Sequence, residues 1–151
     1  MTNQSSHETR SFPTITLIVP ALNEEKLIVE TVEQIVGVAE GRFADYEVLL
    51  VNDGSTDTTG RLMDGLAKRN ARIRVFHNPT NIGLGFSYHL GVAHARHEFV
   101  MLLCGDGGMP ASSLPAIFDK IGTADVVVPY CENLKEITDC GRINPLLHTL
   151  R

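Results

Sequence analysis

The sequence predicts an α/β fold, a doubly wound and mostly parallel sheet with helices on both faces. Short apolar runs alternate along the chain with stretches of helical apolar spacing. Several of these runs end in polar or glycine-rich turns, as strands do at the ligand-binding edge of an α/β sheet. The chain has 151 residues, 43% of them hydrophobic and 21% charged, which suits one soluble domain with its own core.

The first strand is predicted over residues 15–19, an uninterrupted apolar run. Pro20 should end its hydrogen-bond ladder, because proline has no backbone N–H. Asn23 is then expected to cap a helix over residues 28–39, where apolar residues recur at helical spacing. Gly41 follows as the stop signal for this helix.

The second strand is predicted over residues 46–51 and the third over residues 73–76. Between them, apolar positions in the segment 62–67 mark the inner face of a helix. The Ser/Thr/Asp composition of the preceding turn predicts that this helix is capped near Ser55 or Thr56.

The same alternation continues in the second half of the chain. Proline and glycine mark a loop over residues 77–85, which leads into a helix carrying Phe86, Leu90 and Ala93. The apolar run 99–103 predicts a fourth strand that is buried on both faces.

A last helix is expected over residues 114–121 and a fifth strand over residues 125–128. Strands joined by helices imply parallel pairing with right-handed crossovers. The predicted domain covers residues 14–130, after a polar tail at residues 1–13 and before a weakly patterned segment at residues 131–151.

Charge and composition exclude some classes of function. The net charge is −5 and there is no basic run, so we expect no nucleic-acid partner. The first dozen residues lack the basic and apolar regions of a signal peptide, and no apolar stretch approaches the ~20 residues that cross a bilayer. We therefore expect a cytoplasmic protein.

Carboxylates follow three of the predicted strands, at Glu24, Asp53 and Asp106. If the strands are parallel, these side chains meet at one edge of the sheet. There Asp53 could accept a hydrogen bond from a nucleotide base and Glu24 from ribose hydroxyls, while Asp106 would hold Mg²⁺ or Mn²⁺ against phosphate oxygens. Taken alone, the turn after the second strand is equally well explained as a helix cap.

Four motifs together resemble the family 2 glycosyltransferases with the GT-A fold, including dolichyl-phosphate mannose synthase-like enzymes. They are Val-Pro-Ala-Leu-Asn-Glu at 19–24, Val-Asn-Asp-Gly-Ser-Thr-Asp at 51–57, Asn-Ile-Gly-Leu-Gly at 81–85 and Gly-Asp at 105–106. The resemblance spans residues 15–128 and implies a Rossmann-like half that binds a UDP- or GDP-sugar with a divalent metal. The implied activity is inverting transfer of the sugar to a polyprenyl phosphate or a saccharide.

The resemblance also assigns residues to the implied site. The metal ligand would be Asp106, and Asp53 would read the base edge. The nucleotide-binding residues carried over from the family's motifs are Pro20, Leu22, Asn23, Glu24, Asn52, Asp53 and Gly83.

Three positions depart from the family pattern. Cys104 stands where the first aspartate of an Asp-x-Asp metal motif is usual, and a thiol is a poor ligand for Mg²⁺. Leu22 replaces an aromatic residue, which weakens stacking on the base. Asn52 replaces an aspartate and removes one charge. Metal binding should therefore be weaker, or depend on water and diphosphate oxygens.

Members of the family continue beyond the region of resemblance, where they carry the acceptor site and any general base. No catalytic base is therefore expected in this chain, and residues 131–151 would begin the missing acceptor region. A saccharide hydroxyl needs such a base to remove its proton, whereas a lipid phosphate is already anionic. A lipid acceptor would bring the protein to the cytoplasmic face of a membrane.

Two other functions stay open from the sequence. The chain could be a truncated or degenerate domain that binds a nucleotide without turnover. It could also be a phosphate-accepting signalling domain centred on Asp53, although the acidic pair and the lysine of such a domain are not evident. An NAD site is disfavoured, because the glycines at 83–85 do not complete a Gly-x-Gly-x-x-Gly motif.

Overall fold

A computed structural model describes residues 12–129; residues 1–11 and the predicted acceptor segment 131–151 lie outside the described part. The elements alternate along the chain as the sequence predicts. In order they are β1 (Thr14–Ala21), α1 (Ile28–Ala39), β2 (Asp45–Asn52), α2 (Thr59–Arg69), β3 (Ile73–His77), α3 (Leu84–His94), β4 (Phe99–Leu102), the short 3₁₀ helix η1 (Ala111–Ser113) and α4 (Leu114–Phe118).

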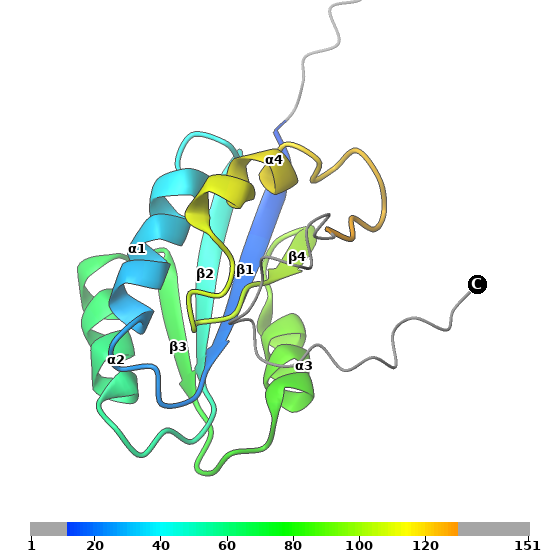
Figure 1. Ribbon diagram of the computed structural model, residues 1–151. Helices are drawn as coiled ribbons and strands as arrows, with labels where there is room; N and C mark the ends of the chain where they lie inside the picture. Colours follow the sequence, from blue (N-terminus) through cyan, green and yellow to red (C-terminus); the bar gives the residue numbers. More distant parts are fainter. Residues whose placement is uncertain (1–11, 130–151) are drawn as a thin grey trace, which may run out of the picture.

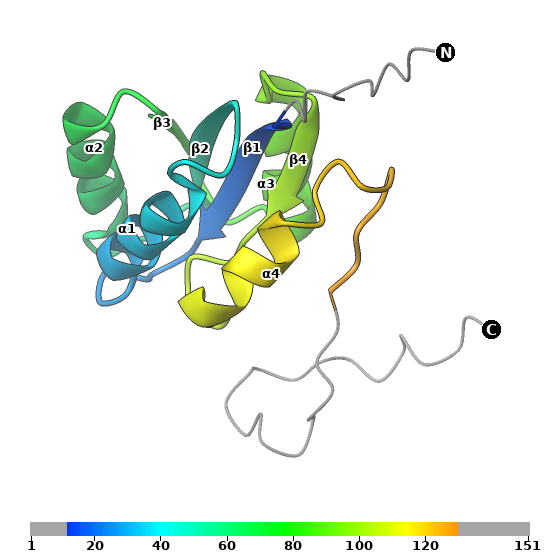
Figure 2. The same ribbon diagram turned by 90° about the horizontal axis from the view of Figure 1, so that it is seen from above.

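The strands form one sheet in the order β3-β2-β1-β4, and every neighbouring pair is parallel. Helices α1, α2 and α4 cover one face of this sheet, while α3 lies on the other (Figures 1 and 2). The prediction of a parallel α/β sheet with helices on both faces is confirmed. All strands therefore point their carboxyl ends toward the same edge.

The core has one layer on each side of the sheet, because successive strand residues face opposite sides. Leu17 and Val48 point into the larger layer, under α1 and α2. Ile18, Leu49 and Val51 point the other way and pack against α3. All of these side chains are fully buried, which explains why the strands read as continuous apolar runs.

The buried carboxylate of Glu47 links neighbouring strands by hydrogen bonds at the amino end of the sheet. Glu47 Oε1 accepts hydrogen bonds from Thr16 Oγ1 and the backbone N–H of Arg96, each at 2.9 Å, and its Oε2 accepts from Arg74 Nη1 at 2.9 Å. Burial by itself raises the pKa of Glu47, but the donors led by Arg74 outweigh it and hold the pKa below its usual value. The network joins three strands to the segment that follows α3.

The predicted fifth strand is wrong. Residues 125–128 form no strand, and the side chains of Val126 and Val128 are 76% and 77% exposed. The segment lies near the free edge of β4, since residues of both line one cavity, but it forms no ladder with β4, which pairs only with β1 among residues 12–129. Valine-rich composition therefore does not make a strand here.

Two predicted boundaries also differ from the structure. Strand β1 continues through Pro20, which pairs in register with Val51. The Pro20 carbonyl accepts a hydrogen bond from Gly105 N–H, so its missing N–H points to the same side, where β4 has already ended at Leu102. The last helix is shorter than predicted, because α4 ends at Phe118 and a turn follows.

Candidate functional site

The four strands deliver their following loops to one edge of the sheet. Backbone hydrogen bonds continue the ladder past the strand ends, from Asp53 N–H to the Ala21 carbonyl at 2.9 Å and from Asn78 N–H to the Asn52 carbonyl at 2.9 Å. The loop after β4 is held in the same way, by Gly105 N–H. These bonds fix where each loop begins, so the polar residues that follow are placed by the sheet.

Asp53 joins the loop after β2 to the loop after β3. Its Oδ1 accepts hydrogen bonds from Asn78 Nδ2 at 2.9 Å and from Ile82 N–H at 3.0 Å, and its Oδ2 accepts from Gly83 N–H at 3.0 Å. The residue is only 5% exposed. We refer to this set of bonds, from Asp53 to Asn78, Ile82 and Gly83, as the Asp53 latch.

The latch keeps the carboxylate ionised. Burial raises the pKa of Asp53, but the hydrogen bonds from Ile82 and Asn78, with smaller contributions from Ser87 and Gly83, outweigh it and lower the pKa below the ordinary aspartate value. A buried carboxylate engaged in this way is a poor acceptor for phosphorylation, so the geometry does not favour the signalling-domain hypothesis.

Gly54 lets the two loops cross in close contact. It has a φ of 75°, and a Cβ atom added there would lie 2.3 Å from the Thr80 carbonyl carbon and 2.4 Å from the Asn81 nitrogen. The atoms in the way belong to the backbone, so they cannot turn aside as a side chain could. Only glycine fits at this position, which gives the Asp-Gly sequence a structural meaning.

The loop after β1 is bound to the loop after β2 by reciprocal hydrogen bonds. Asn23 N–H donates to Ser55 Oγ at 3.0 Å, and Thr56 N–H donates back to Asn23 Oδ1 at 2.9 Å. The prediction that Asn23 caps the following helix is wrong, because α1 is preceded by Leu27 and has no side-chain cap. Asn23 instead adopts a left-handed φ of 57° and satisfies a neighbouring loop.

Further bonds strengthen the same pair of loops. Glu24 N–H donates to Thr59 Oγ1 at 2.8 Å, and Glu25 Oε2 accepts from both the N–H and the hydroxyl of Thr58. Helix α2 begins at Thr59, later than the predicted caps at Ser55 or Thr56, because Asp57 Oδ1 accepts the Thr59 N–H. The serine and threonine residues of this turn therefore serve the joint between two loops.

Negative charge accumulates at this edge. The pKa of Glu24 is raised by burial first and then by the nearby charges of Asp106 and Asp57. Asp106 is exposed, and its Oδ1 accepts the Gly108 N–H at 2.9 Å. The carboxylates of Glu24 and Asp106 are thus close enough to repel each other, as the sequence predicts, and a cationic ligand would relieve this repulsion.

The donor set suits a metal that takes most of its ligands from elsewhere. No group of three or more His, Cys, Asp or Glu side chains is arranged to hold a metal ion among residues 12–129. Asp106 offers one exposed carboxylate, and Cys104 beside it is exposed as well. Mg²⁺ is often bound by one or two carboxylates together with phosphate oxygens and water, so the residues present fit such a metal only together with a diphosphate.

The remaining predicted site residues have different surroundings. Leu22 is exposed beside Asn23, Pro20 is buried within β1, and Gly83 precedes α3 with a φ of 92°. The Asn52 side chain is engaged within the fold: its Oδ1 accepts Ser55 N–H and its Nδ2 lies 3.0 Å from His77 Nδ1. Asn52 therefore stabilises the loop after β2 and links it to the end of β3.

Sequence reasoning missed two residues of the latch. Asn78 and Ile82 donate to Asp53, but an Asn-Pro turn and an apolar loop residue carry no local signal of a distant acceptor. The partner lies in another loop, so only the folded arrangement reveals the pairing.

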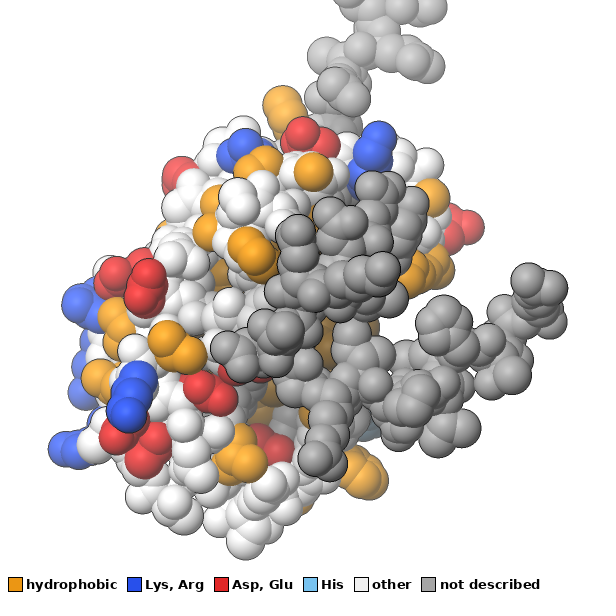
Figure 3. Space-filling view, viewed as in Figure 1, with side chains coloured by type: hydrophobic (Ala, Val, Ile, Leu, Met, Phe, Trp, Pro, Cys, Tyr) orange, Lys and Arg blue, Asp and Glu red, His pale blue; other side chains and the backbone are white. Residues whose placement is uncertain are grey.

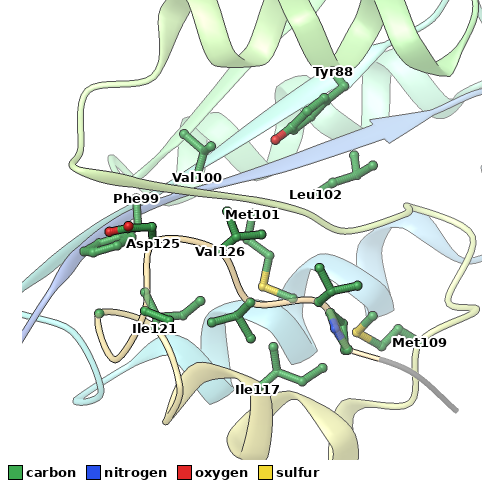
Figure 4. Close-up of a pocket in the computed structure, with 15 residues that line it drawn as sticks. Tyr88, Phe99, Val100, Met101, Leu102, Met109, Ile117, Ile121, Asp125 and Val126 are labelled. Carbon is green, nitrogen blue, oxygen red and sulfur yellow. The ribbon is translucent and has the colours of Figure 1, made fainter. Parts of the chain in front are cut away.

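A separate apolar cavity lies on the open side of β4 (Figure 4). It has a volume of about 390 Å³ and lies between β4, Ile117 of α4 and the segment 124–129. Met101 and Val126 approach it from opposite sides. None of the predicted site residues lines it, so this cavity is separate from the carboxylate-bearing loops.

Comparison with known proteins gives a consistent picture. The sequence model of glycosyl transferase family 2 matches residues 16–148. A dolichyl-phosphate beta-glucosyltransferase of Trichomonas vaginalis is 30% identical over 130 residues, covering 78% of this chain and 39% of the relative.

Solved structures share the fold. The mannosyltransferase PcManGT of Pyrobaculum calidifontis, in complex with GDP-Man and Mn²⁺, aligns with a TM-score of 0.58 at 26% identity, over 64% of this chain and 28% of the other. TarS 1–349 of S. aureus, in complex with UDP-GlcNAc, aligns with a TM-score of 0.53 at 26% identity, over 71% and 31%. The chain spans only 36–40% of the length of the first three curated relatives it matches.

Proposed function

The chain belongs to glycosyl transferase family 2, and we propose that the loops at its carboxyl edge are the donor site of a glycosyltransferase. The site takes a UDP- or GDP-sugar with Mg²⁺ or Mn²⁺, for inverting transfer to a polyprenyl phosphate or a saccharide. The observation that carries this proposal is the joint that Asp53 makes between the loops after β2 and β3, with Glu24 and Asp106 at the same edge. The nucleotide sugars in the two structural neighbours support it.

In this proposal the loop after β1 forms the wall of the nucleotide pocket. Leu22 and Glu24 line the base and the ribose, and Pro20 fixes where the loop leaves the sheet. Asn23 and Asn52 act through the loops they hold, since their amides are hydrogen-bonded to Thr56 and Ser55. These bonds set the shape of the pocket before the ligand arrives, which lowers the cost of ordering it on binding.

Asp53 has two roles in the proposed site. Three hydrogen bonds make it the residue that positions the loop at Ile82 and Gly83. Oδ2 accepts the Gly83 N–H, and because a carboxylate oxygen can accept more than one hydrogen bond, it could also accept one from a base N–H at the edge. Its lowered pKa keeps it an acceptor at neutral pH.

Asp106 would hold the divalent cation together with oxygens of the diphosphate. When bound, such a cation neutralises the charge that develops on the departing diphosphate. The protein has a net charge of −5 and no basic run, so it has little else with which to hold that group. The pKa of Glu24 is raised by burial and then by the charge of Asp106, so a cation bound at Asp106 should lower the pKa of Glu24.

A lipid phosphate is the acceptor that suits this chain best. It is already anionic and needs no general base, so the catalytic contribution of the chain is to hold and orient the donor. The similarity to a dolichyl-phosphate beta-glucosyltransferase supports this choice. The enzyme would then work at the cytoplasmic face of a membrane. No helix within residues 12–129 is long and apolar enough to span a bilayer.

The alternative is a domain that binds the donor without turnover. A transfer assay separates the two. The chain, its Asp106→Ala variant and a longer version are incubated with labelled UDP-glucose or GDP-mannose and vesicles that contain polyprenyl phosphate.

Metal-dependent transfer by the chain, lost in the variant, supports the enzyme. Donor binding with transfer only by the longer version supports the alternative. Absence of both donor binding and transfer from every protein contradicts the proposed site.

A further inference from the structure

An apolar surface adjoins the candidate site and has no role in it. The segment from Val75 to Ala95 contains no Lys, Arg, Asp or Glu. Within it Ile82, Leu84 and Phe86 are 43%, 51% and 69% exposed. We call these three residues the apolar tip. Their side chains come from the end of the loop after β3 and the first turn of α3.

Helix α3 is not amphipathic in the way of an ordinary surface helix. Its inner side packs on Ile18, Leu49 and Val51, yet residues pointing away from the sheet include Phe86 and the 41% exposed Val92. His89 and His94 are also exposed on α3, so its largest exposed apolar side chains lie at the first turn, in Leu84 and Phe86. Charged side chains instead gather over α1 and α2, at the left of Figure 3, while hydrophobic atoms protrude at the lower right, beside the amino end of α3.

The apolar tip is fixed to the candidate donor site by the Asp53 latch. The backbone N–H groups of Ile82 and Gly83 bind the Asp53 carboxylate, so the latch lies on the same few residues as the exposed side chains. The loop between β3 and α3 is at the lower edge of the molecule in Figure 1. A surface that contacts the tip is therefore held close to the carboxyl edge where the donor would bind.

We propose that the apolar tip inserts into the interface of an electrically neutral phospholipid bilayer and so holds the donor site at the membrane. This inference rests on the proposed function, because a polyprenyl phosphate stays anchored in its bilayer and the donor must be brought to it. The absence of basic residues from the tip, and the net charge of −5, favour zwitterionic over anionic lipid. Partitioning then depends on the apolar area of three exposed side chains.

Vesicle flotation tests the proposal without any nucleotide. The chain is mixed with phosphatidylcholine vesicles and compared with the double variant Leu84→Ser/Phe86→Ser. Both substituted side chains are exposed, so the melting temperature should stay unchanged. A matched control is Val126→Ser/Val128→Ser, which removes two side chains that are more exposed still but lie in the segment beyond α4.

We expect the wild type and the control to float with the vesicles, and the partition coefficient of the Leu84/Phe86 variant to fall by at least about tenfold. Equal flotation of all three proteins, or no flotation of the wild type, overturns the proposal. Dimerisation of the wild type that is lost in the Leu84/Phe86 variant, seen by analytical ultracentrifugation, also overturns it, since the tip would then join two copies.

Titration with UDP and GDP in the absence of vesicles tests the donor site separately from the membrane role of the apolar tip. The Leu84/Phe86 variant should bind nucleotide as the wild type does, because neither side chain belongs to the latch. Loss of flotation with intact nucleotide binding supports the membrane role of the tip. Nucleotide binding without flotation of the wild type refutes that role alone, and flotation without nucleotide binding by any of the proteins refutes the donor site alone.

Discussion

Replacing Gly54 with alanine should separate the two loops that the Asp53 latch joins. The added Cβ would lie 2.3 Å from the Thr80 carbonyl carbon, against a normal contact of roughly 3.5–4 Å. Both chains at this crossing are backbone, so one loop has to move. That movement pulls the segment carrying Ile82 and Gly83 away from Asp53.

The size of the effect follows from two costs. A left-handed φ costs a non-glycine residue about 1–2 kcal/mol, and forcing extra volume into a packed contact costs about 1–3 kcal/mol more. Gly41 serves as a control that separates the two costs. Its φ of 74° matches the 75° of Gly54, but nothing lies within 4 Å of a Cβ atom added at Gly41. Gly41→Ala should therefore show the first cost alone, and Gly54→Ala both.

Thermal unfolding followed by circular dichroism measures the difference. For a chain of this size each kcal/mol lowers the melting temperature by roughly 2–4 °C, so the extra cost should make Gly54→Ala melt about 2–12 °C below Gly41→Ala. The Gly54 variant should also lose affinity for UDP or GDP, which the Gly41 variant keeps. Equal melting temperatures for the two variants would refute the close crossing of the loops.

The buried polar groups allow further predictions. Asp53→Asn should destabilise the chain by about 2 kcal/mol at pH 7, because Gly83 N–H or its neighbours would lose an ionised acceptor. The pKa of Asp53 is lowered on folding, so its contribution is complete above the ordinary aspartate pKa of about 3.9 and disappears as the pH falls through the lower folded value. Unfolding of both proteins by urea from pH 7 to pH 3 should show the gap closing at acid pH, and a gap that widens there would contradict the assignment. Glu47→Gln should cost about 1–3 kcal/mol through loss of its pairing with Arg74, whereas Asp45→Asn, at an exposed pair, should leave the melting temperature nearly unchanged. Similar shifts in melting temperature for these two variants would show that the buried Glu47 network stabilises the fold no more than the exposed pair does.

Local sequence patterns predicted the sheet well because its strands are apolar and its helices regular. The order of strands and helices through β4, the helix over residues 28–39 and the closeness of Glu24 to Asp106 follow from periodicity and turn chemistry. Parallel pairing followed from the helical crossovers. These features depend on neighbours in the sequence, which is why a single sequence was enough.

The failures share a different cause, since each depends on a partner far away in the chain. Asn23 resembles a helix cap, but its acceptor serves Thr56 in another loop. Pro20 does not end β1, because its missing N–H faces the side where β4 has already ended at Leu102. The run 125–128 has strand composition, yet it forms no ladder with β4, although residues of both line the same cavity. Pattern alone cannot tell whether such partners exist.

The most direct test of the donor site is calorimetric titration of the folded chain with UDP and with GDP, each with and without Mn²⁺, alongside the Asp106→Ala variant. We expect one nucleotide to bind the wild type more tightly when Mn²⁺ is present, with this metal dependence lost in the variant. Failure of both nucleotides to bind a demonstrably folded protein, or identical metal dependence in the variant, would contradict the assignment of Asp106 and the carboxyl edge to a nucleotide sugar.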